Sequence, residues 1–376
     1  MKHPVTKFQQ IRIEPGRRIL VVSDIHGHLS YLRKGLEKAA FTEDDILIVV
    51  GDIVEKGPDS LGVLRYVMEL CERGNVIPLI GNVDTMRMKL IDELSEENAD
   101  GFYRYILGQR AWWGTSFYDE LAQECGYIIR SPEDMLLSKN TIITHFQREF
   151  DFLAELPTVV ETQNYIFVHG GLPKKRLADN RDKGVFELTK YNRFMTETKH
   201  IFDKYLVVGH WPVCLYGQDR QQYNPIINRE KHIISIDGGC GTESAGQLNV
   251  LIIPDIDSGV ENIFYMGVDE IPCVRALDSQ EERAGSVYIS WQSRAIKILE
   301  RGEEFSYIEH IDSGQKLYIP NTYIRKDNEC RDYTDYMLPV KEGDTLGLIT
   351  RTAKGCIVKK DGKIGWYCGA YEAVPD

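Results

Sequence analysis

The sequence predicts a mixed α/β domain with a parallel sheet, followed by a smaller region built from short strands. Strand and helix patterns alternate through the first eighty residues, and each of these strands ends in a polar residue. After about Asp269 the helical periodicity stops, and short strands with Gly and Asp turns follow. A chain of 376 residues is long enough for two or three domains.

The first strand is predicted over the apolar run 19–22, which leads into Asp24 and His26 and then Gly27. Because side chains of an extended segment alternate with period two, Asp24 and His26 are expected to point the same way. Helical spacing over 29–40 predicts that a helix follows the glycine turn.

The same pattern returns twice. A buried strand over 45–50 ends at Gly51 and Asp52, and an amphipathic helix is predicted over 61–73. A third strand over 76–80 ends at Gly81 and Asn82. Repeated strand–helix units predict a parallel sheet, whose binding sites form at the carboxyl ends of the strands.

Residues 85–160 have a mostly helical pattern, which predicts an insertion or cap over the site. Strands over 165–168 and 205–208 then lead to His169 and His210. Apolar runs at 232–236 and 247–254 are typical of closing strands in a mixed sheet.

Six polar residues therefore stand at predicted strand ends. They are Asp24, His26, Asp52, Asn82, His169 and His210. Nitrogen and oxygen ligands of this kind suit Mn, Fe or Zn. Each residue alone has a simpler explanation, such as a helix cap, a turn or a buried histidine, but six together at successive strand ends favour a metal site. If Asp52 bridges two ions roughly 3.5–4 Å apart, the pair can activate water and hold a phosphate.

The order of motifs DxH, GDxVxxG, GNxD, VHGG and GHxP resembles the calcineurin-like metallophosphoesterase superfamily. It is most similar to the phosphoprotein phosphatase branch, which includes bacterial Ser/Thr phosphatases and symmetrical diadenosine tetraphosphatases. The resemblance implies a four-layer α/β/β/α sandwich over residues 1–272 and a metal-dependent phosphoesterase that uses a metal-bridging hydroxide. It also implies a division of the ligands: Asp24 and His26 on the first metal, Asp52 bridging, and Asn82, His169 and His210 on the second.

The chain departs from the family pattern at the residues that assist the leaving group. The family's catalytic histidine is replaced by Val83, its acidic partner by Glu55, and its phosphate-holding arginine by Lys56. Lysine contacts phosphate only as a point charge. Valine cannot donate a proton, and general acid catalysis is worth typically ~10²–10⁴-fold. Two interpretations remain open: an enzyme suited to good leaving groups, or a catalytically weak metal-binding scaffold.

Two further residues are candidates for the missing roles. His145 is a possible substitute proton donor, with a core or surface histidine as the simpler alternative. Arg181 falls where the family often places a phosphate-holding arginine.

The candidate catalytic residues are Asp52, Glu55 and His145, and the candidate substrate-binding residues are Asn82, Lys56 and Arg181. By resemblance, we expect a phosphorylated protein or a nucleotide as substrate, with Ser/Thr phosphatase activity placed ahead of dinucleoside polyphosphate hydrolase or phosphodiesterase activity.

The last hundred residues contain an internal repeat, in which 300–305 matches 341–346 and 317–324 matches 365–371. The pattern resembles tandem Src-homology-3-like barrels, predicted over 285–330 and 331–376. Four aromatic residues of these segments are either a platform for a peptide partner or packing inside small barrels. They are Tyr318, Tyr323, Trp366 and Tyr371.

Composition restricts the partners and the compartment. The net charge of −12, without basic runs, argues against nucleic-acid binding. No apolar stretch is long enough to predict a membrane span, and the first residues do not resemble a signal peptide. Eight scattered cysteines without a CxxC pair are typical of reduced thiols, so we expect a cytoplasmic protein.

Overall fold

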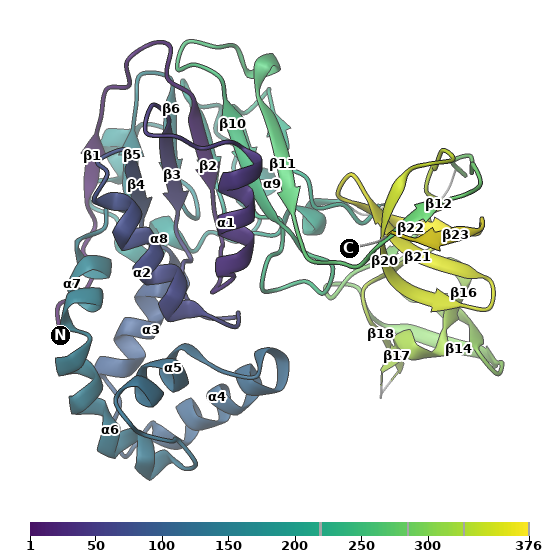
Figure 1. The fold of residues 1–376 in the computed structure, drawn as a ribbon, viewed down its shortest axis with the longest axis horizontal. Helices are drawn as coiled ribbons and strands as arrows, with labels where there is room; N and C mark the ends of the chain where they lie inside the picture. The colour runs from purple at the N-terminus through teal and green to yellow at the C-terminus, as the bar shows by residue number, and fades with distance from the viewer. Residues whose placement is uncertain (218–219, 284–285, 326–327, 375–376) are drawn as a thin grey trace. The chain divides into compact units, whose positions relative to one another are not determined.

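The computed structural model describes residues 1–217, 220–283, 286–325 and 328–374, which divide into two compact units (Figure 1). The first unit comprises Met1–Pro212 and Pro225–Val268, and the second comprises Val213–Asn224 and Asp269–Asp376. The domain boundaries 1–272, 285–330 and 331–376 stay predictions. Residues 285, 326–327 and 375–376 of the predicted repeats lie outside the described residues.

The first sheet of unit 1 has the strand order β11-β10-β2-β3-β4. Strands β2, β3 and β4 are parallel, and β10 and β11 continue the sheet in antiparallel pairing. Their bounds are β2 Ile19–Val22, β3 Ile46–Val50, β4 Val76–Leu79, β10 Leu248–Ile253 and β11 Phe264–Val268. Helices α1 (Leu29–Lys38) and α2 (Ser60–Cys71) connect the parallel strands, which confirms the predicted strand–helix units.

The second sheet has the order β1-β5-β6-β7-β9-β8, with β6, β7 and β9 parallel. Its strands are β1 Phe8–Gln10, β5 Val159–Glu161, β6 Tyr165–Val168, β7 Tyr205–Val208, β8 Ile226–Asn228 and β9 Ile233–Ser235. Strand β1 was not indicated by the sequence pattern, because it is a three-residue edge strand without apolar alternation. Two short helices, α8 (Val185–Thr189) and α9 (Phe194–Glu197), lie between β6 and β7 along the chain.

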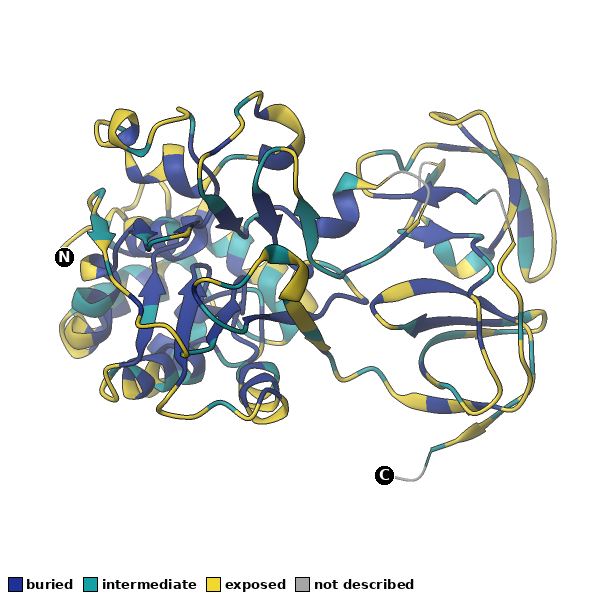
Figure 2. Cartoon of the chain, turned by 90° about the horizontal axis from the view of Figure 1, so that it is seen from above, coloured by how far each residue is buried: buried dark blue, intermediate teal, exposed yellow. Residues whose placement is uncertain are grey.

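The two sheets share one hydrophobic core, and alternation along the strands explains how. Val21 and Ile48 of the first sheet pack in the same buried cluster as Phe167 and Val207 of the second. The intervening residues of β2 and β3, such as Val49, belong instead to the cluster with the helices. Both faces of these strands are therefore buried. Figure 2 shows dark blue strands in the interior of the molecule. The full four-layer arrangement stays a prediction.

A helical insertion separates β4 from β5, and its helices gather below the strands in the view of Figure 1. The helices are α3 Asn82–Asp92, α4 Ala99–Trp113, α5 Phe117–Glu124, α6 Pro132–His145 and α7 Gln147–Glu155. Ser116 and Ser131 cap α5 and α6 by accepting hydrogen bonds from backbone N–H groups, and Gly114 ends α4 in the left-handed conformation. This region matches the helical pattern predicted for 85–160 as far as Glu155.

The second unit is rich in β-structure. A five-stranded sheet joins β12 Cys273–Ala276 to β20 Thr345–Thr352, β21 Gly355–Lys360, β22 Lys363–Tyr367 and β23 Tyr371–Ala373. A three-stranded sheet contains β14 Ile296–Arg301, β15 Phe305–His310 and β16 Lys316–Pro320. Two short pairs complete the set: β13 Tyr288–Ile289 with β19 Tyr333–Thr334, and β17 Ile324–Arg325 with β18 Glu329–Cys330. The Src-homology-3-like character of these sheets stays a prediction.

The aromatic residues singled out in this region differ in exposure. Trp366 is buried, and its Nε1–H donates to the Thr334 carbonyl at 3.1 Å. The Tyr323 hydroxyl lies 2.9 Å from the Thr350 hydroxyl. Tyr318 is 55% exposed. These contacts favour the packing interpretation for Trp366 and Tyr323.

None of the helices in the described ranges combines the length and apolarity that a membrane crossing needs.

Candidate active site

Three of the predicted ligands form a tight buried group after strands β2 and β3. The Nε2 atom of His26 lies 3.9 Å from Oδ1 of Asp24 and 3.7 Å from Oδ2 of Asp52. One ligand atom from each of the three residues falls within 4.8 Å of the other two. Two carboxylates and an imidazole at this spacing are suited to a divalent cation.

The other three predicted ligands meet next to Asp52. Nε2 of His169 lies 3.3 Å from Oδ2 of Asp52 and 3.0 Å from Oδ1 of Asn82. The same Asn82 atom is 2.8 Å from Nδ1 of His210. All six predicted ligands are thus brought together, and Asp52 adjoins both groups.

These residues fit a bound cation. The amide oxygen of Asn82 faces the ring nitrogens of His169 and His210 and the carbonyl oxygen of Thr189. Without a metal, a rotated amide would place its nitrogen there, where it could donate to these three atoms. A cation between the amide oxygen and the two nitrogens satisfies all three atoms, because each offers a lone pair.

Hydrogen bonds behind the site select the ring nitrogens that face it. Nδ1 of His169 donates to the Val50 carbonyl at 2.7 Å, because a carbonyl can only accept, and in the neutral imidazole Nε2 then has the lone pair that a metal needs. Nε2 of His210 donates in the same way to the Asn192 side-chain oxygen at 2.8 Å, which leaves Nδ1 for a metal. Asn192 was missed by sequence reasoning because no motif marks it.

The backbone at the site is strained. Asp24, His26, Asp52 and His210 all have positive φ angles between 48° and 68°. Residues other than glycine rarely adopt this left-handed backbone conformation, and those that do cluster at functional sites. Two motif glycines make room for the carboxylates: a Cβ atom at Gly81 would collide with Asp52, and one at Gly209 would collide with Asp24.

Burial and mutual charge shift the pKa values of the ligands. Burial raises the pKa of Asp24 to about 6 and lowers the pKa of His26 well below its usual value. Burial also acts to raise the pKa of Asp52, but the neighbouring His169 and His26 outweigh it and hold that pKa below its usual value. Two buried carboxylates this close favour a cation between them.

The loop after Asp52 carries two of the three residues that depart from the family pattern, and the third, Val83, follows Asn82. Glu55 is buried, and its Oε2 lies 2.7 Å from Nε of Arg87. Nζ of Lys56 reaches to 3.2 Å from Nε2 of His26. Val83 is also buried, and its backbone N–H donates to Oδ1 of Asp52 at 2.8 Å. Lys56 therefore presents its charge at the ligand cluster, whereas Glu55 is tied to Arg87.

Asp84, the last residue of the GNxD motif, was not among the candidate site residues. Its carboxylate accepts backbone hydrogen bonds from Ile53, Val54 and Gly81 at 2.9–3.1 Å. It joins the loop after β3 to the start of α3 and so fixes the approach of Asp52 to Asn82. The GNxD motif did contain this aspartate. The sequence cannot show, however, whether such a carboxylate accepts hydrogen bonds from the backbone or binds a metal.

The structure does not bring His145 or Arg181 to the ligand cluster. His145 ends α6, where its side chain is 50% exposed and its Nε2 lies 3.3 Å from Glu124. Arg181 is exposed and stacks over the Phe8 ring at 5.0 Å. Both residues therefore have partners elsewhere in the first unit.

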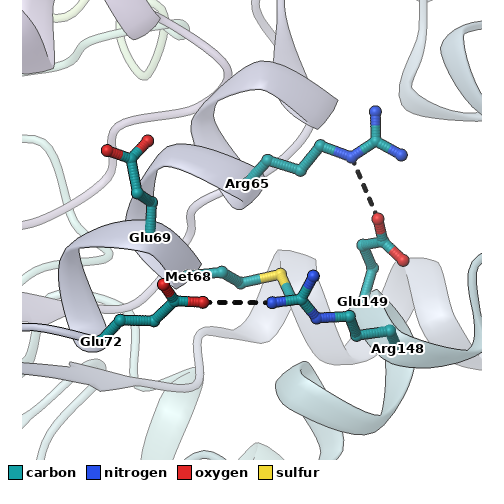
Figure 3. Close-up of a pocket in the computed structure, with 6 residues that line it drawn as sticks. All are labelled: Arg65, Met68, Glu69, Glu72, Arg148 and Glu149. Atoms are coloured by element: carbon teal, nitrogen blue, oxygen red, sulfur yellow. Dashed lines mark hydrogen bonds and ion pairs between the residues drawn. The ribbon is translucent and has the colours of Figure 1, made fainter.

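A surface pocket of about 410 Å³ lies between α2 and α7, lined by Arg65, Met68, Glu69, Glu72, Arg148 and Glu149. Figure 3 shows its charges paired across the opening, Arg65 with Glu149 and Arg148 with Glu72. The pocket contains none of the six ligand candidates, and each of its two arginines pairs with a glutamate of the lining.

A two-sheet α/β fold with carboxylates and histidines gathered at its strand ends defines a metal-dependent hydrolase. A family model described as calcineurin-like phosphoesterase matches residues 17–228, and the chain belongs to this family. Members of the family use two divalent metal ions, for which the cluster of Asp24, His26 and Asp52 is a fitting site.

Similar proteins include phosphatases and nucleotide hydrolases. Serine/threonine-protein phosphatase 1 of Salmonella typhimurium is 41% identical over 70 residues, 18% of this chain and 32% of that protein. A symmetrical bis(5'-nucleosyl)-tetraphosphatase of Buchnera aphidicola is 32% identical over 93 residues, 24% of this chain and 33% of that protein. The chain thus spans about a third of the length of these relatives. The solved structure of a putative diadenosine tetraphosphatase matches with a TM-score of 0.43 and 19% identity, covering 70% of this chain and 99% of that one.

Proposed function

We propose that this protein is a two-metal phosphoesterase that acts on phosphate monoesters, with a phosphorylated serine or threonine side chain of a protein as its substrate. The observation that carries the proposal is the position of Asp52. Its Oδ2 lies 3.7 Å from His26 and 3.3 Å from His169, so one carboxylate adjoins both ligand groups. A shared carboxylate is what a closely spaced metal pair requires.

The roles of the residues follow from their positions. Asp24 and His26 hold one ion, Asn82, His169 and His210 hold the other, and Asp52 contacts both. Two bound ions, which we take to be Mn, Fe or Zn, lower the pKa of water and neutralise phosphate charge. Lys56 adds a positive charge for a phosphate oxygen, because its Nζ already lies beside His26.

The surroundings of Val83 favour substrates with good leaving groups. Val83 offers no proton, and Glu55 is engaged by Arg87 and by the Phe117 backbone N–H at 3.2 Å. The rate should therefore depend steeply on the pKa of the leaving group, because the departing oxygen receives no proton from these residues. This feature supports a second candidate function, hydrolysis of a dinucleoside polyphosphate or an aryl phosphodiester, whose phosphate or phenolate leaving group is less basic than an alkoxide.

The test compares four substrates at equal Mn²⁺: p-nitrophenyl phosphate, bis-p-nitrophenyl phosphate, a phosphoserine peptide and diadenosine tetraphosphate. Metal content is measured on the same sample. Turnover of the monoesters, including the peptide, with about two metals per chain is the expected result. Preference for diadenosine tetraphosphate or the diester would establish the second candidate. Two bound metals without turnover of any substrate would leave a metal-binding scaffold and overturn both.

A further inference from the structure

The loop between β3 and α2 has an unusual conformation at two successive residues. Glu55 and Lys56 have φ angles of 69° and 59°, in the left-handed region. This backbone conformation is unfavourable in free energy for residues other than glycine. Two such residues in succession adopt it only where surrounding contacts stabilise it. The contacts that hold this pair are therefore of interest.

Glu55 is fastened from three sides. Its backbone N–H donates to the Ser60 hydroxyl at 3.0 Å, and its Oε1 accepts the Phe117 N–H at 3.2 Å. Its Oε2 forms the 2.7 Å ion pair with Arg87. The side chains of Glu55 and Arg87 are only 2% and 4% exposed, so water does not screen this pair.

Arg87 is itself fixed by the helical insertion. It projects from α3 one turn after Val83, and its guanidinium carbon lies 4.0 Å from the centre of the Tyr105 ring on α4. The position of Glu55 is thus set by three helices of the insertion, α3 and α4 through Arg87 and α5 through the Phe117 N–H. Because Lys56 is the next residue, the same contacts fix the backbone from which its side chain extends toward His26.

We propose that Arg87 is a positioning residue for substrate phosphate. Through Glu55, it holds the loop in the left-handed conformation that directs Lys56 to the ligand cluster, where the ammonium contacts a phosphate oxygen. In the family pattern an arginine holds the phosphate and an acid pairs with the catalytic histidine. In this chain Lys56 contacts the phosphate instead, and its position depends on the buried Glu55–Arg87 pair. This inference rests on the proposed function.

The experiment measures affinity for inorganic phosphate by calorimetry on the Mn²⁺-loaded full chain, together with the KM for p-nitrophenyl phosphate. Arg87→Met is compared in the natural and the Lys56→Ala backgrounds. We expect phosphate affinity to fall about tenfold in the natural background and to stay nearly unchanged when Lys56 is already absent. The KM should rise in parallel with little change in kcat. Arg87→Lys, which keeps the charge, should recover part of the loss.

Arg65→Met is the matched control, because Arg65 is also an ion-paired arginine of this unit, and its partners Glu124 and Glu149 lie outside the loop. It should leave phosphate affinity unchanged. If Arg87→Met unfolds the chain, the double variant Glu55→Gln with Arg87→Met removes both buried charges and should show the same loss of affinity.

An equal loss from Arg87→Met with and without Lys56 would overturn the inference, as would unchanged phosphate affinity. Loss of metal from the Arg87 variants would also overturn it, because Arg87 would then act on the ligands. If the natural chain binds phosphate but turns over no substrate, the proposed function is refuted. The link between Arg87 and Lys56 is then judged from the calorimetric phosphate affinities alone.

Discussion

At the scale of single residues, Asp52 is the side chain shared by the two ligand groups. It follows β3 at the end where Asn82, His169 and His26 also arrive, and its Oδ1 accepts the Val83 N–H. The carboxylate is therefore placed by backbone contacts as well as by its ligand neighbours. Removing its charge should disturb both groups at once.

Asp52→Asn should lower bound metal and reduce phosphoesterase activity by more than about 100-fold, because loss of even an outer contact to a metal ligand costs ~10–100-fold. Metal content by atomic emission and the rate with p-nitrophenyl phosphate test this. Asp45→Asn is the matched control: Asp45 is buried just before β3 and pairs with Arg18 at the opposite end of the strand. Full metal content and rate in Asp52→Asn would refute the ligand assignment.

At the scale of elements, the start of α2 shows how the insertion supports the parallel sheet. The Asp59 side chain accepts the Gly62 N–H at 3.0 Å, as an N-cap does. Glu120 of α5 accepts the N–H groups of Ser60 and Leu61 at 3.1 and 2.7 Å. The first backbone donors of α2 are thus satisfied partly from its own chain segment and partly from the insertion.

This contact predicts a pH dependence of stability. Burial raises the pKa of Glu120 to about 7, from an ordinary 4.5, although the two backbone hydrogen bonds oppose the shift. The folded chain then binds a proton that the unfolded chain has lost, so the contribution of Glu120 to stability is complete below pH 4.5 and declines as the pH rises to about 7. Urea denaturation of Glu120→Gln should lack this decline. If the difference in unfolding free energy between natural chain and variant is constant from pH 4.5 to 7.5, the raised pKa is wrong.

At the scale of the whole molecule, metal binding and folding are coupled, because the ligands come from four strands and α3 and converge only in the folded chain. Mn²⁺ at 100 times its dissociation constant should stabilise the first unit by about 2.7 kcal/mol for one site. The thermal midpoint should rise with Mn²⁺ and fall with a chelator. Asp52→Asn should lose most of this response, and an equal response in that variant would show that the ions bind elsewhere.

The division into two units assigns Val213–Asn224 to the C-terminal unit. Tyr223 is fully buried there, and its backbone N–H donates to the Gly362 carbonyl at 2.8 Å. This segment precedes β8 and β9 of the first unit in the chain, so the two units are connected more than once.

Tyr223→Ala should destabilise the C-terminal unit by about 3–5 kcal/mol, because it leaves a large cavity. Hydrogen exchange should quicken in β21 and β22 and stay slow in β2 and β3, with metal content unchanged. Tyr318→Ala, at a residue 55% exposed in the same unit, should cost less than about 1 kcal/mol. Faster exchange of β2 and β3 in Tyr223→Ala would contradict the assignment of this segment.

The sequence by itself was enough to predict the main strand–helix units and to single out the six candidate ligands. Apolar runs of β2, β3, β6 and β7 mark buried strands, and a candidate ligand follows each run within two residues. This information is local, because strand periodicity and turn chemistry depend on near neighbours in the chain. For the same reason the sequence alone was enough to group Asp24, His26 and Asp52 at one end of the sheet.

Only the tertiary structure decided which side chains contact one another across the fold. It tied Glu55 to Arg87, aimed Lys56 at His26, and placed His145 and Arg181 away from the ligands. It also assigned Val213–Asn224 to the second unit. These outcomes depend on packing between segments far apart in the chain. From the sequence alone, a charged residue is equally compatible with an active site, an ion pair or the surface, because its partner is set by that packing.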